Sequence, residues 1–149
     1  GDHRDLHSFP TRRSSDLQLL SQNPLIIIDV AHNPNAFQTF VETTSFCGYK
    51  NFKWNVIFGA MSDKDIKSML MFIKPITEEL IATSLRIDRA FKSSQVKQLA
   101  ENLGFRKIKT FDYSLDAFNY CYKKNEPTII IGSFYLAGEI LPIIKNILN

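Results

Sequence analysis

Residues 25–34 read Leu-Ile-Ile-Ile-Asp-Val-Ala-His-Asn-Pro. The run opens with apolar, mostly β-branched side chains, a pattern typical of a strand that is buried on both faces of a parallel sheet. Pro34 suits the first turn of a helix, where a missing N–H costs nothing. Apolar side chains then recur at helical spacing as far as Gly48. The stretch therefore predicts a strand over 25–30, a short polar loop and a helix over 34–48.

The alternation of strand and helix patterns continues to the end of the chain. Further Ile- and Val-rich runs predict strands over 53–58, 79–84, 106–111 and 127–132. Helical spacing predicts four more helices, over 62–75, 93–104, 114–124 and 134–148. Together these elements predict an α/β protein: a Rossmann-like three-layer domain around a mostly parallel sheet of about five to six strands.

Polar residues and glycine mark the ends of the predicted helices. Ser62 or Asp63 is expected to cap the second helix. Ser93 is expected to cap the third, and Gly104 to close it. In the fourth helix, Leu115 is expected to face the core because it falls on the apolar stripe.

Length and composition exclude several functional classes. The chain has 149 residues and a mass of 17.1 kDa, the size of one ordinary domain. Its net charge of +3 is small and scattered along the sequence, which argues against a nucleic-acid partner or an anionic membrane surface. The longest apolar runs fall far short of the roughly 18 residues that a membrane span needs. Cys47 and Cys121 show no metal-binding spacing. We therefore expect a soluble, cytoplasmic protein without a metal site of its own.

Residues 1–17, Gly-Asp-His-Arg-Asp-Leu-His-Ser-Phe-Pro-Thr-Arg-Arg-Ser-Ser-Asp-Leu, have neither a helical nor a strand period. A twin-arginine signal does not fit, because polar residues rather than an apolar segment follow Arg12 and Arg13. In one reading frame the stretch resembles the translation of a sequencing adapter. We therefore expect 1–17 to be a non-native, disordered segment fused to a truncated gene, and the domain to occupy 18–149. His3 and His7 are accordingly not expected to bind metal.

Ligands of such sheets bind at the carboxyl ends of the strands, so the loops after Asp29, Gly59 and Gly132 are the candidate sites. After the first strand, Asp29, His32 and Asn33 place a carboxylate, an imidazole and an amide just before a helix. The carboxylate can accept from ribose hydroxyls, and the other two can donate to phosphate oxygens. An equally weighted alternative is that Asp29 and Asn33 cap the helix while His32 only packs in the loop.

The other two loops carry weaker signals. In 59–65, Gly-Ala-Met-Ser-Asp-Lys-Asp, Lys64 can meet an anion, although such a lysine is more often solvated. In 132–138, Gly-Ser-Phe-Tyr-Leu-Ala-Gly, the glycine spacing does not match a dinucleotide fingerprint, and Ser133 can be a plain helix cap. The sequence holds no P-loop, GxSxG elbow or HExxH motif. From the residues alone, it predicts a ligand-binding α/β domain.

Three segments taken together resemble a known family: LIIIDVAHNPNA at 25–36, VIFGAMSDKD at 56–65 and IIIGSFYLAGE at 129–139. They are similar to the C-terminal domain of the bifunctional dihydrofolate synthases/folylpolyglutamate synthases, in the Mur ligase superfamily. The DVAHNPNA stretch is the specific signal, and the other two segments favour the folate branch. The resemblance covers nearly all of 18–149 and implies the fold of a Mur ligase C-terminal domain.

The resemblance implies an ATP-dependent amide ligase that adds L-glutamate to dihydropteroate or tetrahydrofolate through an acyl phosphate, with Mg²⁺ assisting. Asp29 would contact the nucleotide, and His32 would lie near the transferred phosphate as the catalytic candidate. Asn33 would shape the nucleotide loop, and Lys64 is a further nucleotide-binding candidate. The P-loop and the magnesium ligands belong to the family's N-terminal ATPase domain, which this sequence lacks. The chain alone is therefore expected to be inactive, and its parent to be a monomeric enzyme.

Two other functions stay open at this point. A cell-wall peptide ligase of the same superfamily would differ in its acceptor substrate. A stand-alone nucleotide-binding α/β module would lack catalysis and would bind ATP by itself.

Overall fold

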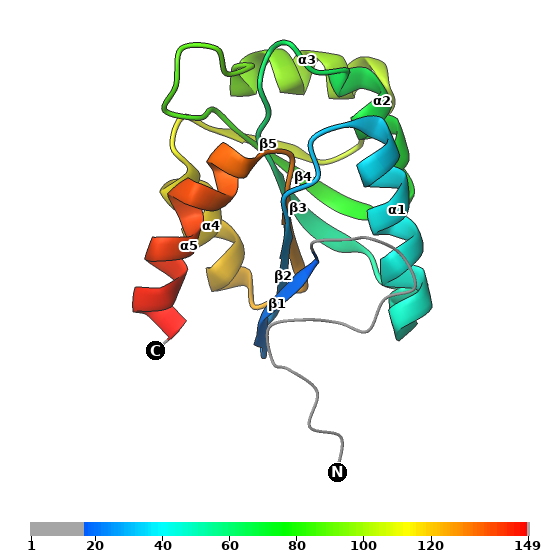
Figure 1. Ribbon diagram of the computed structural model, residues 1–149, viewed down its shortest axis with the longest axis vertical. Helices are drawn as coiled ribbons and strands as arrows, with labels where there is room; N and C mark the ends of the chain where they lie inside the picture. The colour runs from blue at the N-terminus through cyan, green and yellow to red at the C-terminus, as the bar shows by residue number, and fades with distance from the viewer. Residues whose placement is uncertain (1–16, 149) are drawn as a thin grey trace.

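One six-stranded sheet runs through the part of the chain that is described, residues 17–148 of a computed structural model. The strands are β1 (Gln18–Gln22), β2 (Leu25–Asp29), β3 (Trp54–Phe58), β4 (Thr77–Thr83), β5 (Ile108–Phe111) and β6 (Thr128–Ile131). Their order is β1-β2-β6-β3-β4-β5, with β1 antiparallel to β2 and every other pair parallel. The strand that comes last in sequence therefore lies in the middle of the sheet (Figure 1).

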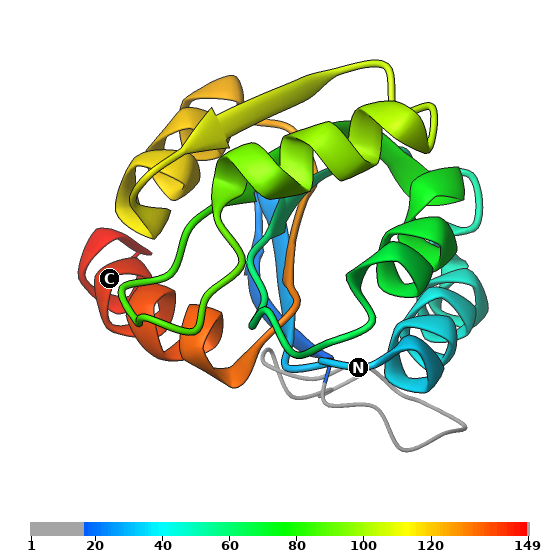
Figure 2. The same ribbon diagram turned by 90° about the horizontal axis from the view of Figure 1, so that it is seen from above.

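Helices cover both faces of this sheet. They are α1 (Pro34–Thr44), the π-helical turn η1 (Ser45–Tyr49), α2 (Ile66–Ile73), the 3-10 turn η2 (Lys74–Ile76), α3 (Ser93–Asn102), α4 (Ser114–Lys124) and α5 (Phe134–Leu148). Seen from above, α1 and α2 lie on one side of the sheet, and α4 and α5 on the other (Figure 2). Val96 and Ala100 of α3 join the apolar cluster of α1 and α2. The predicted three-layer α/β fold with a mostly parallel sheet is confirmed.

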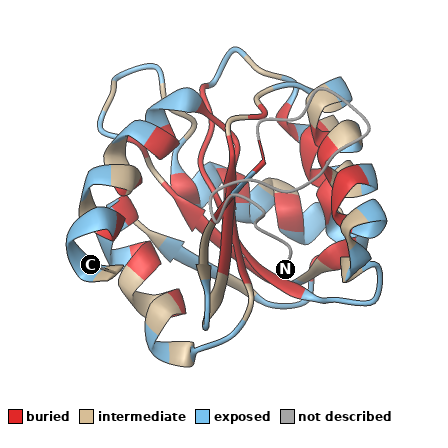
Figure 3. Cartoon of the chain, turned by 60° about the horizontal axis from the view of Figure 1, so that its bottom comes forward, coloured by how far each residue is buried: buried red, intermediate tan, exposed pale blue. Residues whose placement is uncertain are grey.

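The central strands are apolar on both faces because each face is covered by helices. Along β2, Ile27 belongs to the cluster with α1 and α2, whereas Ile26 and Ile28 belong to the cluster with α4 and α5. The same alternation runs along β3, β4 and β6. Figure 3 shows buried strands between helices whose outer surfaces are exposed. Burying each such side chain contributes about 1.5–3 kcal/mol, so these alternating contacts hold the layers together.

The pattern in the sequence did not reveal β1. This strand pairs antiparallel with β2 at the edge of the sheet, after a turn that contains a cis Asn23–Pro24 peptide bond. Of its five residues only Leu19 is buried, and its register shifts before Ser21. A short edge strand that is mostly polar lacks the apolar run by which the other strands were predicted. Those other strands are all present, with ends within two residues of the predicted ones.

Two helices are capped by residues other than those predicted. α2 begins later than expected, and Asp65 caps it by accepting from the Ser68 N–H at 3.2 Å. α3 has Lys92 at its cap position, and the N–H of Ser93 donates to the Ser84 side chain at 2.9 Å. The predictions of Ser62, Asp63 and Ser93 as caps were therefore wrong. In each case a hydrogen bond formed by the folded loop decided the helix start, and propensity alone did not distinguish the candidates.

The other two helix predictions had different outcomes. Gly104 follows the end of α3 with φ +90, as a glycine that closes a helix does. Leu115 was wrongly expected to face the core, because it is 40% exposed. The buried stripe of α4 runs instead through Ala117, Phe118 and Cys121, which places Leu115 at the rim of the packed face.

The prediction for residues 1–17 lies outside the described residues, except at its last position. Leu17 is only 6% exposed and belongs to the same apolar cluster as Ile27. The packed domain therefore includes at least one residue before the predicted boundary at 18.

Among residues 17–148, no helix is long and apolar enough to cross a membrane.

The two cysteines lie in different surroundings. Cys47 is half-buried and Cys121 is buried, and no disulfide joins them. Burial raises the pKa of the Cys121 thiol to about 12, so this group is an inert part of the core at neutral pH.

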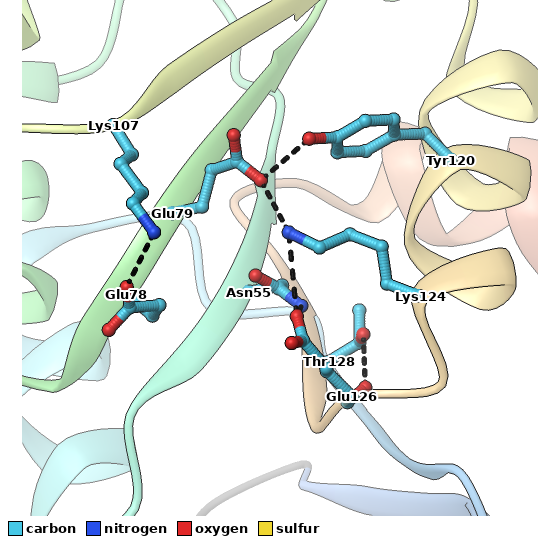
Figure 4. Close-up of polar contacts among 8 residues, drawn as sticks. All are labelled: Asn55, Glu78, Glu79, Lys107, Tyr120, Lys124, Glu126 and Thr128. Atoms are coloured by element: carbon cyan, nitrogen blue, oxygen red, sulfur yellow. Dashed lines mark hydrogen bonds and ion pairs between the residues drawn. The ribbon is translucent and has the colours of Figure 1, made fainter.

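A polar cluster ties the amino ends of the central strands to α4 (Figure 4). Glu79 of β4 is 8% exposed, and its carboxylate accepts from the Tyr120 hydroxyl at 2.9 Å and from Lys124 Nζ at 2.8 Å. Lys124 also lies 3.4 Å from the carboxylate of Glu126. That carboxylate accepts from Asn55 Nδ2 of β3 at 3.0 Å. We call these five residues the amino-edge cluster.

The amino-edge cluster is charged at neutral pH. Burial acts to lower the pKa of Lys124, but the hydrogen bond and charge of Glu79 outweigh it and raise that pKa. The hydrogen bond from Asn55, together with the charge of Lys124, holds the pKa of Glu126 below its usual value. A lowered carboxyl pKa stabilises the fold above the unfolded value of about 4.3 and loses that effect as the pH falls. The cluster therefore stabilises the sheet edge throughout the neutral range.

Glu79→Gln is expected to lower the free energy of unfolding by about 1–3 kcal/mol, because it leaves the Lys124 ammonium without its buried counter-charge. The matched control is Glu78→Gln. Glu78 pairs with Lys107 at 3.1 Å on an exposed surface, so its loss should cost under about 0.5 kcal/mol. Urea unfolding of the two variants measures both values, and equal losses would contradict the buried character of the cluster.

Candidate functional site

The strand order brings the three predicted loops to one place. β6 lies between β2 and β3, and Ile131 is in register with Asp29 on one side and Phe58 on the other. The loops that follow these residues therefore leave the same edge of the sheet side by side. α1 and α2 then pack on one face and α5 on the opposite face. In α/β proteins, ligands bind in the crevice outside the carboxyl ends of parallel strands at such a divergence. We call the three loops that meet here, 30–33, 59–65 and 132–133, together with Asp29 at the end of β2, the crevice.

The loop between β2 and α1 is held by its own side chains. The carboxylate of Asp29 is 4% exposed and accepts from the Ala31 N–H at 2.7 Å. Asn33 caps α1, because its Oδ1 accepts from the Ala36 N–H at 2.9 Å. The alternative that Asp29 and Asn33 only cap the helix is therefore correct for Asn33. Asp29 instead stabilises the loop before the helix. Both residues fix the backbone around His32.

His32 lies half-buried between this loop and α5. Its Nδ1 is 3.2 Å from the Val30 carbonyl oxygen, and its ring lies 5.2 Å from the ring of Phe134, the first residue of α5. When Nδ1 carries the proton and donates to that carbonyl, Nε2 of the neutral ring is an acceptor. Nε2 can donate to an anion only after the ring takes up a second proton. Phe134 itself is 59% exposed, so an aromatic face borders the loop.

The end of β6 lies directly against the end of β3. Gly132 has φ +134, and a Cβ there would collide with the carbonyl oxygen of Gly59. Only glycine combines this backbone conformation with this close approach. Ser133 is 3% exposed, and its Oγ accepts from the Tyr135 N–H at 2.9 Å. Ser133 therefore does cap the start of α5 locally, as the simpler interpretation of this loop proposed.

Lys64 lies in the turn between β3 and α2. Its N–H donates to the Met61 carbonyl at 3.3 Å, and its own carbonyl accepts from the Ile66 N–H at 2.9 Å. The side chain is half-buried. The structure thus places Lys64 on the loop that follows β3, whose first residue, Gly59, lies against Gly132. Among the described residues, no hydrogen bond or ion pair joins the Lys64 side chain to His32 or Asp29.

A second hollow, of about 420 Å³, lies farther along the same edge and includes Arg86, Tyr113 and Glu139. The Glu139 carboxylate accepts from the Ser114 hydroxyl at 2.7 Å and from the Arg86 N–H at 2.8 Å. It therefore ties the loop after β4 to the starts of α4 and α5. The Arg86 guanidinium lies 5.9 Å from the centre of the Tyr113 ring. Nothing in the local sequence indicated this arrangement, because its members come from three distant segments.

Comparison with known proteins assigns this arrangement to a family. The model of the family described as "Mur ligase, glutamate ligase domain" matches residues 17–133. The chain belongs to this family. A curated relative of this glutamate ligase domain is the dihydrofolate synthase/folylpolyglutamate synthase of Escherichia coli (strain K12), 28% identical over 130 residues. The match covers 85% of this chain and 29% of the relative, so the domain spans under a third of that protein.

Solved structures show the same fold. The bifunctional folylpolyglutamate synthase/dihydrofolate synthase of Yersinia pestis, complexed with AMPPNP and a Mn ion, matches with a TM-score of 0.75 and 27% identity. It covers 93% of this glutamate ligase domain and 32% of that chain. The Mycobacterium tuberculosis folylpolyglutamate synthase complexed with ADP and AMPPCP has a TM-score of 0.76 at 21% identity, covering 92% and 32%. This second likeness supports the fold alone.

Metal ligands are not gathered by the part of the glutamate ligase domain that the structure describes. Among residues 17–148, no group of three or more His, Cys, Asp or Glu side chains could hold a metal ion. Asp29 is the one buried carboxylate of the crevice loops described above, and it already accepts from Ala31. These residues therefore do not fit a resident magnesium ion.

Gly132→Ala is expected to destabilise the domain by at least about 2 kcal/mol, because the added Cβ meets the Gly59 carbonyl and the backbone conformation disfavours alanine. Gly138→Ala is the matched control. Gly138 lies in α5 with nothing near its Cβ position, so alanine there should be neutral or stabilise by up to about 1 kcal/mol. Thermal and urea unfolding test both. A Gly132→Ala protein as stable as the control would refute the close approach.

Proposed function

We propose that this chain is the C-terminal domain of an ATP-dependent ligase that joins L-glutamate to dihydropteroate or tetrahydrofolate. The observation that carries the proposal is the crevice of the β2, β6 and β3 loops in a domain whose family is that of glutamate ligases. The E. coli and Y. pestis proteins, whose names give both synthase activities, support the folate substrate. The parent enzyme is proposed to be a cytoplasmic monomer, and the lack of a disulfide between Cys47 and Cys121 is consistent with a reducing compartment.

The proposed reaction has two steps. A folate or pteroate carboxylate oxygen attacks the γ-phosphorus of ATP, so that an acyl phosphate forms and ADP leaves. The amine of glutamate then attacks the acyl carbon, phosphate leaves, and the amine loses a proton as the amide forms. The domain contributes by closing over the nucleotide and orienting the reactants, an effect of position rather than of covalent chemistry.

Within this scheme the crevice residues take different tasks. Asp29 is proposed to contact the nucleotide, with its carboxylate held by the Ala31 N–H. His32 is proposed to lie beside the transferred phosphate, where a protonated ring donates through Nε2 while Nδ1 stays on Val30. Asn33 holds the loop through its cap on α1. Lys64 is proposed as a further cation for the nucleotide, reached from the loop after β3.

The remaining contacts are assigned to the part of the enzyme that precedes this domain. Because the described residues do not fit a magnesium site, we propose that the N-terminal ATPase domain and the ATP phosphates hold Mg²⁺, where it would offset phosphate charge. The same domain would carry the phosphate-binding loop. This division of labour makes the isolated domain a weak nucleotide binder without turnover.

The isolated chain is therefore expected to show no ATP-dependent glutamate ligation. It should bind AMPPNP more weakly than about 1 μM, that is, with less than about 8 kcal/mol. In heteronuclear NMR, the nucleotide should shift amide signals of 29–33 and 132–135 and leave those of Glu79 and Lys124 unchanged. Turnover by the purified chain, or micromolar binding, would favour the stand-alone nucleotide-binding module instead.

A chimera tests the activity itself. Residues 17–149 replace the matching segment of the E. coli relative, and ligation of radiolabelled glutamate to dihydropteroate and to tetrahydrofolate is measured. Activity is expected in the chimera, and Asp29→Asn and His32→Gln should each lower it at least tenfold, about 1.4 kcal/mol in the barrier. Lys97→Gln, on the exposed side of α3, is the control and should leave the rate unchanged. Activity that survives both crevice substitutions would contradict the proposed roles.

A further inference from the structure

A basic hollow lies at the amino edge of the sheet, at the end opposite the crevice. It encloses about 650 Å³ and is lined by residues that precede β3, β4 and β5 and by the first two residues of β4. Its charged residues are Lys53, Lys74, Arg106, Lys107 and Glu78. Four cations and one carboxylate thus come together from three separate segments, although the sequence spreads them over more than fifty positions.

This hollow accounts for the net charge of the domain. Residues 17–148 contain 15 Lys and Arg and 12 Asp and Glu, an excess of three positive charges. The basic hollow holds four of the cations and one of the carboxylates, which is the same excess. Charges over the rest of the described surface therefore balance. Such a local concentration of one sign raises the potential and attracts ions of the opposite sign.

Two of the four cations have no partner for their side chains among the described residues. Lys53 Nζ donates to the Pro75 carbonyl at 2.6 Å, and Lys107 pairs with Glu78 at 3.1 Å. Within the described residues, neither Lys74 nor Arg106 has a hydrogen-bond or ion-pair partner for its side chain. The Lys74 ammonium lies over Gly104, whose missing side chain leaves room beside it.

We propose that the basic hollow binds a small polyanion, a ligand with two or more adjacent phosphate or carboxylate groups. Four cations that share one hollow repel one another, and an anionic ligand relieves that repulsion. Lysines act as point charges toward such groups, whereas the planar fork of Arg106 can bind two oxygens at once. A volume of this size accommodates a small ligand.

The proposed site is separate from the ligase crevice. The charged residues of the hollow lie before or at the start of their strands, whereas those of the crevice lie at the end of theirs or after it. The length of the strands therefore separates the two sites. For strands of about five residues this length is on the order of 15 Å. Occupation of the basic hollow is thus independent of the proposed ligation, and its test needs no turnover.

The test titrates the full chain, at about 50 mM salt, with inorganic tripolyphosphate and, separately, with tri-γ-L-glutamate. The binding isotherm comes from calorimetry, and heteronuclear NMR locates the site. At least one of the two is expected to bind saturably below 1 mM and to shift the signals of residues 74–78 and 103–107. Binding of tripolyphosphate alone would identify a phosphorylated ligand, and binding of the peptide alone a polycarboxylate.

Two double variants make the result decisive. Lys74→Gln with Arg106→Gln is expected to weaken binding at least tenfold, because it removes the unpaired cations. Lys97→Gln with Lys145→Gln removes the same charge from exposed positions on α3 and α5 and should change affinity less than twofold. The proposal is overturned if neither probe binds saturably, or if both double variants lose affinity equally. Lys74 and Arg106 would then only stabilise the negative C-termini of α2 and α3.

Discussion

The pairing of β6 with both β2 and β3 is the constraint on which this domain depends. β6 has only four residues, yet every one is buried and three of them are Ile. It reaches its place after roughly seventy residues that follow β3, so the central ladder closes only when nearly the whole domain is present. Such non-local pairing requires the loop-closure entropy to be overcome before the contacts form. The crevice also depends on this pairing, because the loops that contain Gly132 and Asp29 become neighbours only when β6 pairs with β2.

The fold could be predicted to this extent because buried parallel strands have a distinctive sequence. Continuous apolar runs such as 25–30 and 127–132 can be stable only where helices cover both faces, and this constraint selected the three-layer architecture. The order of strands could not be predicted in the same way, since nothing in an Ile-rich run specifies its neighbour. β1 was not predicted because a strand at the edge of the sheet requires no apolar run. Leu19 is its only buried residue.

The crevice was partly predictable because its residues are adjacent in sequence. Asp29, His32 and Asn33 lie within five positions, and the strand before them placed them at the correct sheet edge. Their individual contacts depended on the folded loop, however: Asn33 proved to be a helix cap, whereas Asp29 turned inward to the backbone of Ala31. Contacts between distant segments, such as that of Glu139 with Arg86, could not be predicted from the local sequence around either residue. Short sequence motifs therefore indicate where a site lies more reliably than how each side chain is used.

The two edges of the sheet differ electrostatically, and the difference follows from the topology. Because β2, β3 and β6 are parallel and each is followed by a helix, the positive helix N-termini of α1, α2 and α5 gather at the carboxyl edge. That edge can therefore attract anions through its backbone N–H groups as well as through its charged side chains. At the amino edge the helix C-termini are negative, so cations are stabilised there. In the amino-edge cluster Lys124 supplies one such cation, and it pairs with both Glu79 and Glu126. The basic hollow carries more positive charge than its surroundings neutralise. Its four cations face only one carboxylate and two helix C-termini, each of which carries about half a negative charge. The remaining positive charge has no counter-charge in the described part of the protein. This excess is the physical reason why an anion is expected to bind at that edge.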